Sequence, residues 1–104
     1  MAQQRCDELD TSLVLARQPL LQCIGRQAQR GHLAQAHRCY RSLRLLESAR
    51  WWLKTVISQG KTDSVYQIAE STRQEFLCKI EQLARSRTPE AVEHIYMEMI
   101  RAFP

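Results

Sequence analysis

Three basic side chains, His37, Arg41 and Arg44, recur at the spacing that brings residues to one face of an α-helix. Guanidinium groups bind phosphate or carboxylate through paired hydrogen bonds, and a row of them can follow a nucleic-acid backbone. Further residues complete the predicted nucleic-acid-binding set: Arg26, Arg30, Arg38, Trp51, Trp52 and Lys54. The tryptophan rings can stack on exposed bases, or they can meet at a dimer interface.

The charge around this row is strongly unbalanced. Residues 17–54 hold eight of the fifteen Lys and Arg residues and one acid, Glu47, which gives a local net charge of +7. A solvated helix face usually alternates its charges to form pairs three or four residues apart, and a single acid cannot supply them. The basic half, residues 17–54, therefore predicts an acidic partner, whereas residues 62–103 form a near-neutral helical half.

Catalytic chemistry is not indicated. Cys39 and Arg44 bracket four residues, where the phosphate-binding loop of cysteine phosphatases has five, and no glycine is present there to cradle a phosphate. The chain also lacks a glycine-rich nucleotide loop, an H-E-x-x-H pair and a nucleophile elbow. We expect a protein that is not an enzyme and that needs no cofactor.

The four cysteines stand at positions 6, 23, 39 and 78, without the paired spacing of a zinc site. No metal site is therefore predicted. The early apolar run is too short for a secretory signal, and no run is long enough for a membrane span. We therefore expect a cytoplasmic protein whose cysteines are all reduced.

A long central helix must position the basic row. No Pro or Gly interrupts residues 32–59, which would form a helix about 42 Å long. At 100° per residue, the row lies opposite a broad apolar face, made of Cys39, Leu43, Leu46, Ala49, Leu53, Val56 and Ile57. Arg50 falls within this apolar face, so its guanidinium must either extend to solvent or pair with a carboxylate on a neighbouring helix, for example the helix that follows. A polar position in an oligomer interface is the alternative.

Other helices should flank the central one. Asp10, Thr11 and Ser12 offer capping oxygens for a first helix, and Pro19 predicts a kink or a new start. Gly31 is a stop signal. Thr62-Asp63 predicts the start of a third helix with an apolar stripe that includes Phe76, Ile80 and Leu83, and Thr88-Pro89-Glu90 predicts the start of the last one.

The segment from Gly31 to Leu43 resembles the second helix of a tetratricopeptide repeat. The resemblance rests on Gly31, the small Ala36 and the aromatic Tyr40, and it covers roughly residues 17–49. Gln27 stands where the preceding helix of such a repeat carries an aromatic residue, and no second copy follows. The resemblance implies a helical hairpin that grips a peptide or a partner helix.

These observations predict one all-α domain, residues 1–104, built as a small bundle of four or five helices and forming a homodimer. Its expected function is to bind nucleic acid, with duplex RNA favoured over DNA, through backbone and shape contacts. The alternative is a helical adaptor, chaperone or inhibitor that docks on an acidic protein.

Overall fold

The chain is described here by a computed structural model that covers residues 2–57 and 70–101. These residues are almost all helical and contain no strand, which confirms the predicted all-α class. The elements are α1 (Ala2–Leu15), α2 (Arg17–Gln29), α3 (Leu33–Trp52), the short π-helical segment η1 (Leu53–Ile57), α4 (Glu70–Arg85) and α5 (Pro89–Arg101).

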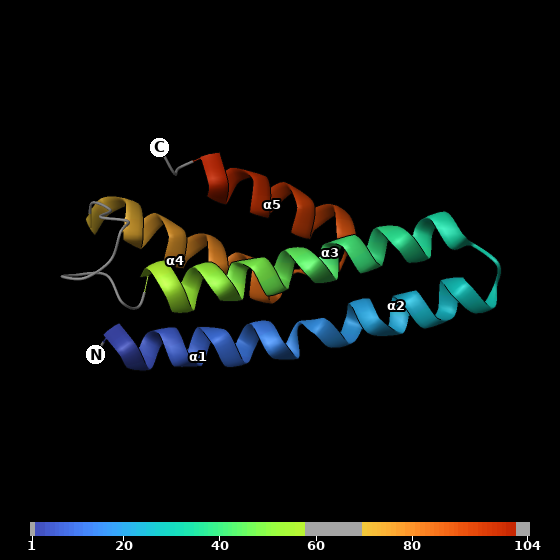
Figure 1. Cartoon of the computed structure of the whole chain (residues 1–104), viewed down its shortest axis with the longest axis horizontal. Helices are drawn as coiled ribbons and strands as arrows, with labels where there is room; N and C mark the ends of the chain where they lie inside the picture. The colour runs from blue at the N-terminus through green and yellow to red at the C-terminus, as the bar shows by residue number, and fades with distance from the viewer. Residues whose placement is uncertain (1, 58–69, 102–104) are drawn as a thin grey trace.

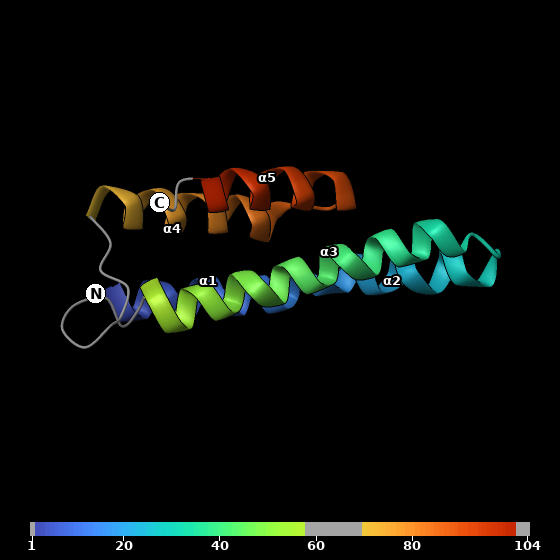
Figure 2. The same cartoon turned by 45° about the horizontal axis from the view of Figure 1, so that its top comes forward.

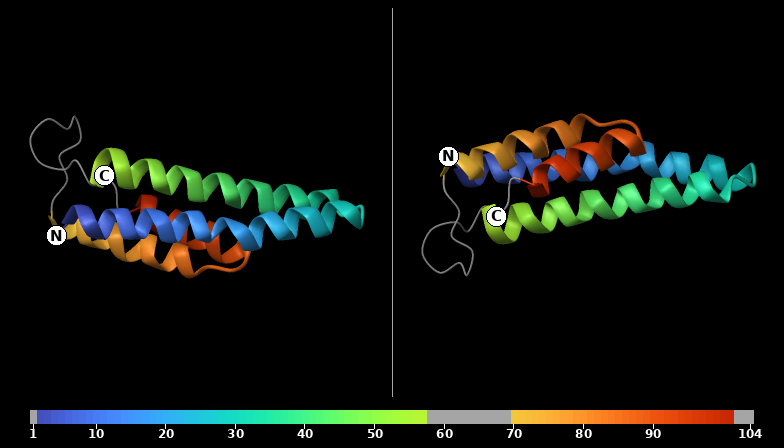
Figure 3. Two further views of the ribbon diagram at one scale, coloured as in Figure 1. Left: turned by 90° about the horizontal axis from the view of Figure 1, so that it is seen from below. Right: turned by 90° about the horizontal axis from the view of Figure 1, so that it is seen from above.

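The helices form a long rod with a shorter hairpin laid on it. Figure 1 shows α1 and α2 following one another in nearly one line, with α3 running back beside both. The α4–α5 hairpin lies on α1 and on the C-terminal half of α3, and Figure 2 shows it as a separate layer. From below and above, Figure 3 shows α2 and the start of α3 extending beyond the α4–α5 turn. The molecule measures 50 × 26 × 19 Å.

Local signals explain most helix boundaries. Ala16 separates α1 from α2, and Pro19 lies in the first turn of α2, where its missing N–H leaves no hydrogen bond unmade. Gly31 adopts a φ of 77° in the turn before α3, as its predicted role as a stop signal requires. The prediction that Asp10 and its neighbours cap the first helix is wrong, because α1 already begins at Ala2.

The last helix begins where the sequence predicts. Pro89 is its first residue, and the Thr88 hydroxyl accepts a hydrogen bond from the Ala91 amide at 3.2 Å. Glu90 places a carboxylate in the first turn, where the helix dipole favours it. The start predicted at Thr62-Asp63 lies outside the described residues.

The core is built largely from the apolar stripes that the sequence predicts. Five residues of the predicted face of α3 and η1 are buried, and Leu43 is partly buried against the core. The Val56 side chain is not among those described. Leu46, Ala49, Leu53 and Ile57 of this face pack with Leu9, Leu13 and Leu20 of the first two helices and with apolar residues of α4 and α5: Phe76, Leu77, Ile80, Leu83, Val92 and Met99.

A disulfide joins Cys23 of α2 to Cys39 of α3 where the cover of the α4–α5 hairpin ends. The expectation that all four cysteines are reduced is therefore wrong for this pair. The sequence could not reveal the pairing, because the residues lie sixteen positions apart and only the antiparallel return of α3 brings them together. Cys6 is a buried free thiol and Cys78 is an exposed one.

Residues 24–38, between the two cysteines, form what we call the distal arm. Within it only Ala36 is buried. The arm is held by contacts between its own two helices, by the disulfide at its base and, at its last residue, by the ion pairs of Arg38 with α5. Among the described helices, none is long and apolar enough to cross a membrane.

Candidate nucleic-acid interface

Half of the basic residues in the segment 17–54 are neutralised inside the molecule. Arg50 donates hydrogen bonds from Nε to Asp10 of α1 at 2.8 Å and from Nη1 to Glu47 at 3.0 Å. Lys54 approaches the same Asp10 at 3.4 Å, and Arg17 pairs with Glu47 at 3.0 Å. The expectation that Arg50 pairs with a carboxylate on a neighbouring helix is thus confirmed, but the acid comes from α1 and not from the helix that follows.

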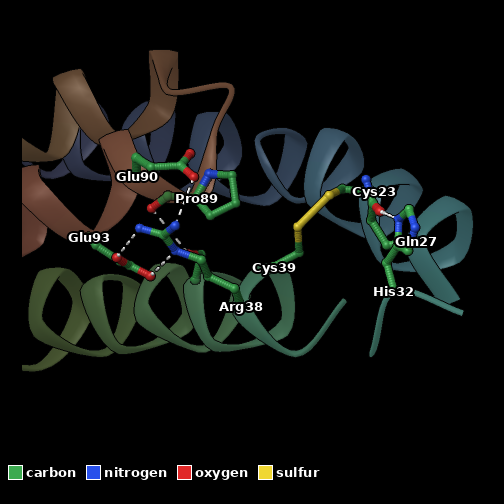
Figure 4. The surroundings of a disulfide bond; sticks show 9 residues. Cys23, Gln27, His32, Arg38, Cys39, Pro89, Glu90 and Glu93 are labelled. Carbon is green, nitrogen blue, oxygen red and sulfur yellow. Dashed lines mark hydrogen bonds and ion pairs between the residues drawn. A yellow bond between two sulfur atoms is a disulfide. The ribbon is translucent and has the colours of Figure 1, made fainter. Parts of the chain in front are cut away.

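Arg38 is also neutralised. It makes a bidentate pair with Glu93 of α5, at 3.3 and 3.2 Å, and its Nη1 reaches Glu90 at 3.0 Å. Figure 4 shows it extending from α3 between these two carboxylates. The hydrogen bond and charge of Glu93 raise the pKa of the Arg38 guanidinium. Arg38 therefore fastens α3 to α5 and does not extend the free basic row.

The remaining basic residues of this segment face solvent. Four arginines, whose side chains are all exposed, form no ion pair with any acid among residues 2–57 and 70–101: Arg26, Arg30, Arg41 and Arg44. The first two belong to the distal arm and the last two to α3. We call them the four free arginines.

Their spacing follows from the register of the hairpin. The pairs Cys23–Cys39 and Arg17–Glu47 show that the residues of α2 and α3 that lie side by side have numbers that add to about 62. Arg30 is therefore displaced from Arg44 by about twelve residues along the rod, or about 18 Å at the helical rise. The four free arginines are spread along one end of the molecule.

Two aromatic residues accompany the arginines of α3. Tyr40 is 47% exposed, and its ring stacks on that of His37 with the centroids 6.4 Å apart. Trp51 is 50% exposed, whereas Trp52 packs toward the core against Phe76. The structure thus makes Trp51 the exposed member of the predicted pair.

Tyr40 is absent from the predicted set, although the signal was available. It lies three residues after His37 and four before Arg44, so a helix must place it beside both. Trp52 and Lys54 are less suited to an interface than predicted, since Trp52 packs on the core and Lys54 is paired with Asp10.

Among the described residues, no three His, Cys, Asp or Glu side chains lie close enough together to hold a metal ion.

Comparison with protein-family models, with curated proteins and with solved structures gave no match for this chain.

Proposed function

We propose that this protein binds nucleic acid without performing chemistry on it, through the four free arginines and the exposed rings beside them. The observation that carries the proposal is the division of the basic segment. Arg50 meets a carboxylate of α1, Arg38 meets two of α5, and Arg17 of α2 meets Glu47 of α3. The arginines that face solvent lack an acidic neighbour in the described structure. Unpaired guanidiniums of like sign are favourable when phosphates bind between them and release counterions.

Duplex RNA is the partner that we favour. The arginines lie on the exposed faces of α2 and α3. α3, a helix of twenty residues, is tied to α5 by Arg38 and is not a separate short recognition helix. Such a surface suits contacts to phosphates and 2′-hydroxyls along a duplex more than insertion into a DNA major groove. Coating of the duplex would withhold it from other proteins.

The test removes three of the four free arginines. The triple variant Arg26→Gln, Arg30→Gln, Arg41→Gln should weaken the binding of a fluorescent RNA duplex on the order of 100-fold at 0.1 M salt. The slope of log affinity against log salt should become less steep by about 2.7, because three phosphate contacts are lost. Fluorescence anisotropy at several salt concentrations measures both quantities.

A matched control removes three exposed charges elsewhere: Arg85→Gln, Arg87→Gln and Arg101→Gln. This variant has the same net charge as the first, so it should keep most of the affinity if the four free arginines form the binding surface. Equal losses in the two variants would show that only net charge matters, and no binding by the unaltered protein would reject nucleic acid as the partner. A preference for single-stranded RNA would reject the duplex.

A further inference from the structure

A second helical stripe runs along α3 on the side away from the core. Its members alternate four and three residues apart, which is the a/d spacing of a coiled-coil seam. All of them are exposed: Leu33, His37, Tyr40, Arg44, Glu47 and Trp51. We call these six residues the outer seam. The apolar members are largely uncovered, with Leu33 70% exposed and Trp51 50% exposed.

The outer seam is complementary to itself when it is read in the opposite direction. Two antiparallel copies of α3 that cross near residue 42 bring together positions whose numbers add to 84. Leu33 then faces Trp51 of the second copy, and His37 faces Glu47. The Glu47 carboxylate also accepts hydrogen bonds from Arg17 and Arg50 of its own chain. Tyr40 faces Arg44, which can lie over the ring in a cation–π contact. Two-fold symmetry makes each pair twice, so all six positions are used.

We infer that a second copy of this chain docks on the outer seam, antiparallel and in this register. The charges decide the direction, because a parallel in-register pair would place Arg44 against Arg44 and Glu47 against Glu47. A shift by one heptad in either direction would engage only four of the six seam positions. One of these shifts brings Arg44 to Glu47, but it also sets His37 against Lys54 and leaves Leu33 without a seam partner. An antiparallel coiled coil pairs a positions with d positions, as the proposed register does.

This inference does not depend on RNA binding, but it narrows the proposed surface. In the dimer Arg44, Tyr40 and Trp51 lie in the outer seam, so Arg26, Arg30 and Arg41 of each copy remain to contact RNA. Arg41 lies about 60° from Arg44 around α3, at the edge of the outer seam rather than in it. The two-fold axis brings both copies of Arg41 to the same side of the helix pair, about two residues apart along it. The dimer would therefore join two short basic surfaces into one longer surface.

The oligomeric state gives the first test. Sedimentation equilibrium of nuclease-treated, RNA-free protein at up to about 100 µM should give the mass of a dimer, since this concentration populates a dimer with a micromolar Kd. The variant Leu33→Glu, Trp51→Glu should be monomeric, because it places four carboxylates at the ends of the seam. The control Leu15→Glu, Met97→Glu alters two equally exposed apolar residues away from the seam and should stay dimeric. Circular dichroism verifies that both variants are folded.

A distance between two labels tests the register. A spin label at exposed Ala34, introduced as Ala34→Cys in a Cys78→Ser background, leaves only the buried Cys6 as a second free thiol. The proposed register separates the two labelled backbone positions by about 26 Å. Parallel helices would give about 10 Å, and a shift by one heptad would give about 36 Å in one direction and about 17 Å in the other.

A monomeric unaltered protein would overturn the inference, as would a distance near 10, 17 or 36 Å. A dimer that survives the seam variant would overturn it as well. Because the charge variants used to test RNA binding leave the outer seam intact, the two proposals can fail separately.

Discussion

The direction in which each guanidinium points decides what it can do in this protein. Arg50 and Arg41 lie on the same helix, yet Arg50 faces α1 and meets Asp10, while Arg41 faces solvent. The helical period predicts such directions from the sequence. The helical period does not predict which acid each guanidinium contacts, because Asp10 lies forty residues from Arg50 and Glu93 lies fifty-five residues from Arg38. A charge count along the chain therefore overstated the free basic surface.

The pair between Asp10 and Arg50 should contribute to stability. Both side chains are four-fifths or more shielded from solvent, so screening by water is limited. Asp10→Asn should lower the free energy of unfolding by about 1–2 kcal/mol at neutral pH, since Arg50 and Lys54 lose a shared partner. Urea unfolding followed by circular dichroism measures this loss. Glu75→Gln, at an exposed acid without an ion pair among the described residues, should change stability by less than about 0.5 kcal/mol.

The contribution of the Asp10–Arg50 pair to the free energy of unfolding should depend on pH. Burial raises the pKa of the Asp10 carboxyl, but the hydrogen bond and charge of Arg50, with those of Lys54, outweigh burial and leave the pKa below its ordinary 3.8. The stabilisation is therefore complete above the unfolded pKa and is lost as pH falls through the lower folded one. The difference between the unaltered protein and Asp10→Asn should be constant above about pH 5 and should shrink below pH 4. A difference that grows on acidification would contradict this reading.

At the scale of helices, the sequence predicts a helix boundary well where capping or turn residues determine it without help from tertiary packing. Gly31 and the Thr88-Pro89 pair mark their boundaries because caps and turns depend on a few adjacent residues. The early start of α1 was missed, since its residues are stabilised by packing against α4 rather than by a strong cap. The π-helical turn of η1 was likewise not predicted, because it has no distinct composition.

Replacing Gly25 of α2 and Gly31 of the turn that follows it by alanine should change the stability of the protein in opposite directions. Gly31→Ala forces a φ of 77° on a residue with a Cβ and should cost about 1–2 kcal/mol. Gly25→Ala adds a Cβ that meets no atom within 4 Å inside a helix, so it should stabilise by about 0.5–1 kcal/mol. Thermal unfolding of the two variants measures both shifts. Equal effects would mean that the turn before α3 does not require a left-handed residue.

At the scale of the whole molecule, stability should fall along the rod from the covered end to the distal arm. The covered end packs α1, α3, α4 and α5 around one core, whereas the arm has Ala36 as its one buried residue. Arg38 with Glu90 and Glu93, and the hydrogen bond from the Ser42 hydroxyl to the Pro89 carbonyl, fasten α3 where this cover ends. Two of the four free arginines therefore lie on the part of the protein with the least support.

Hydrogen exchange with and without a reductant should reveal this gradient. The disulfide closes a loop of about fifteen residues, and loop-closure entropy gives such a link up to about 3 kcal/mol. Reduction should therefore speed amide exchange in residues 26–36 by up to about 100-fold while leaving α4 and α5 nearly unchanged, since the core does not depend on the arm. Mass spectrometry of peptic fragments resolves the two regions. A Cys78→Ser variant, which keeps the disulfide, should exchange like the unaltered protein; a uniform increase on reduction would instead show that the arm and the core unfold as one unit.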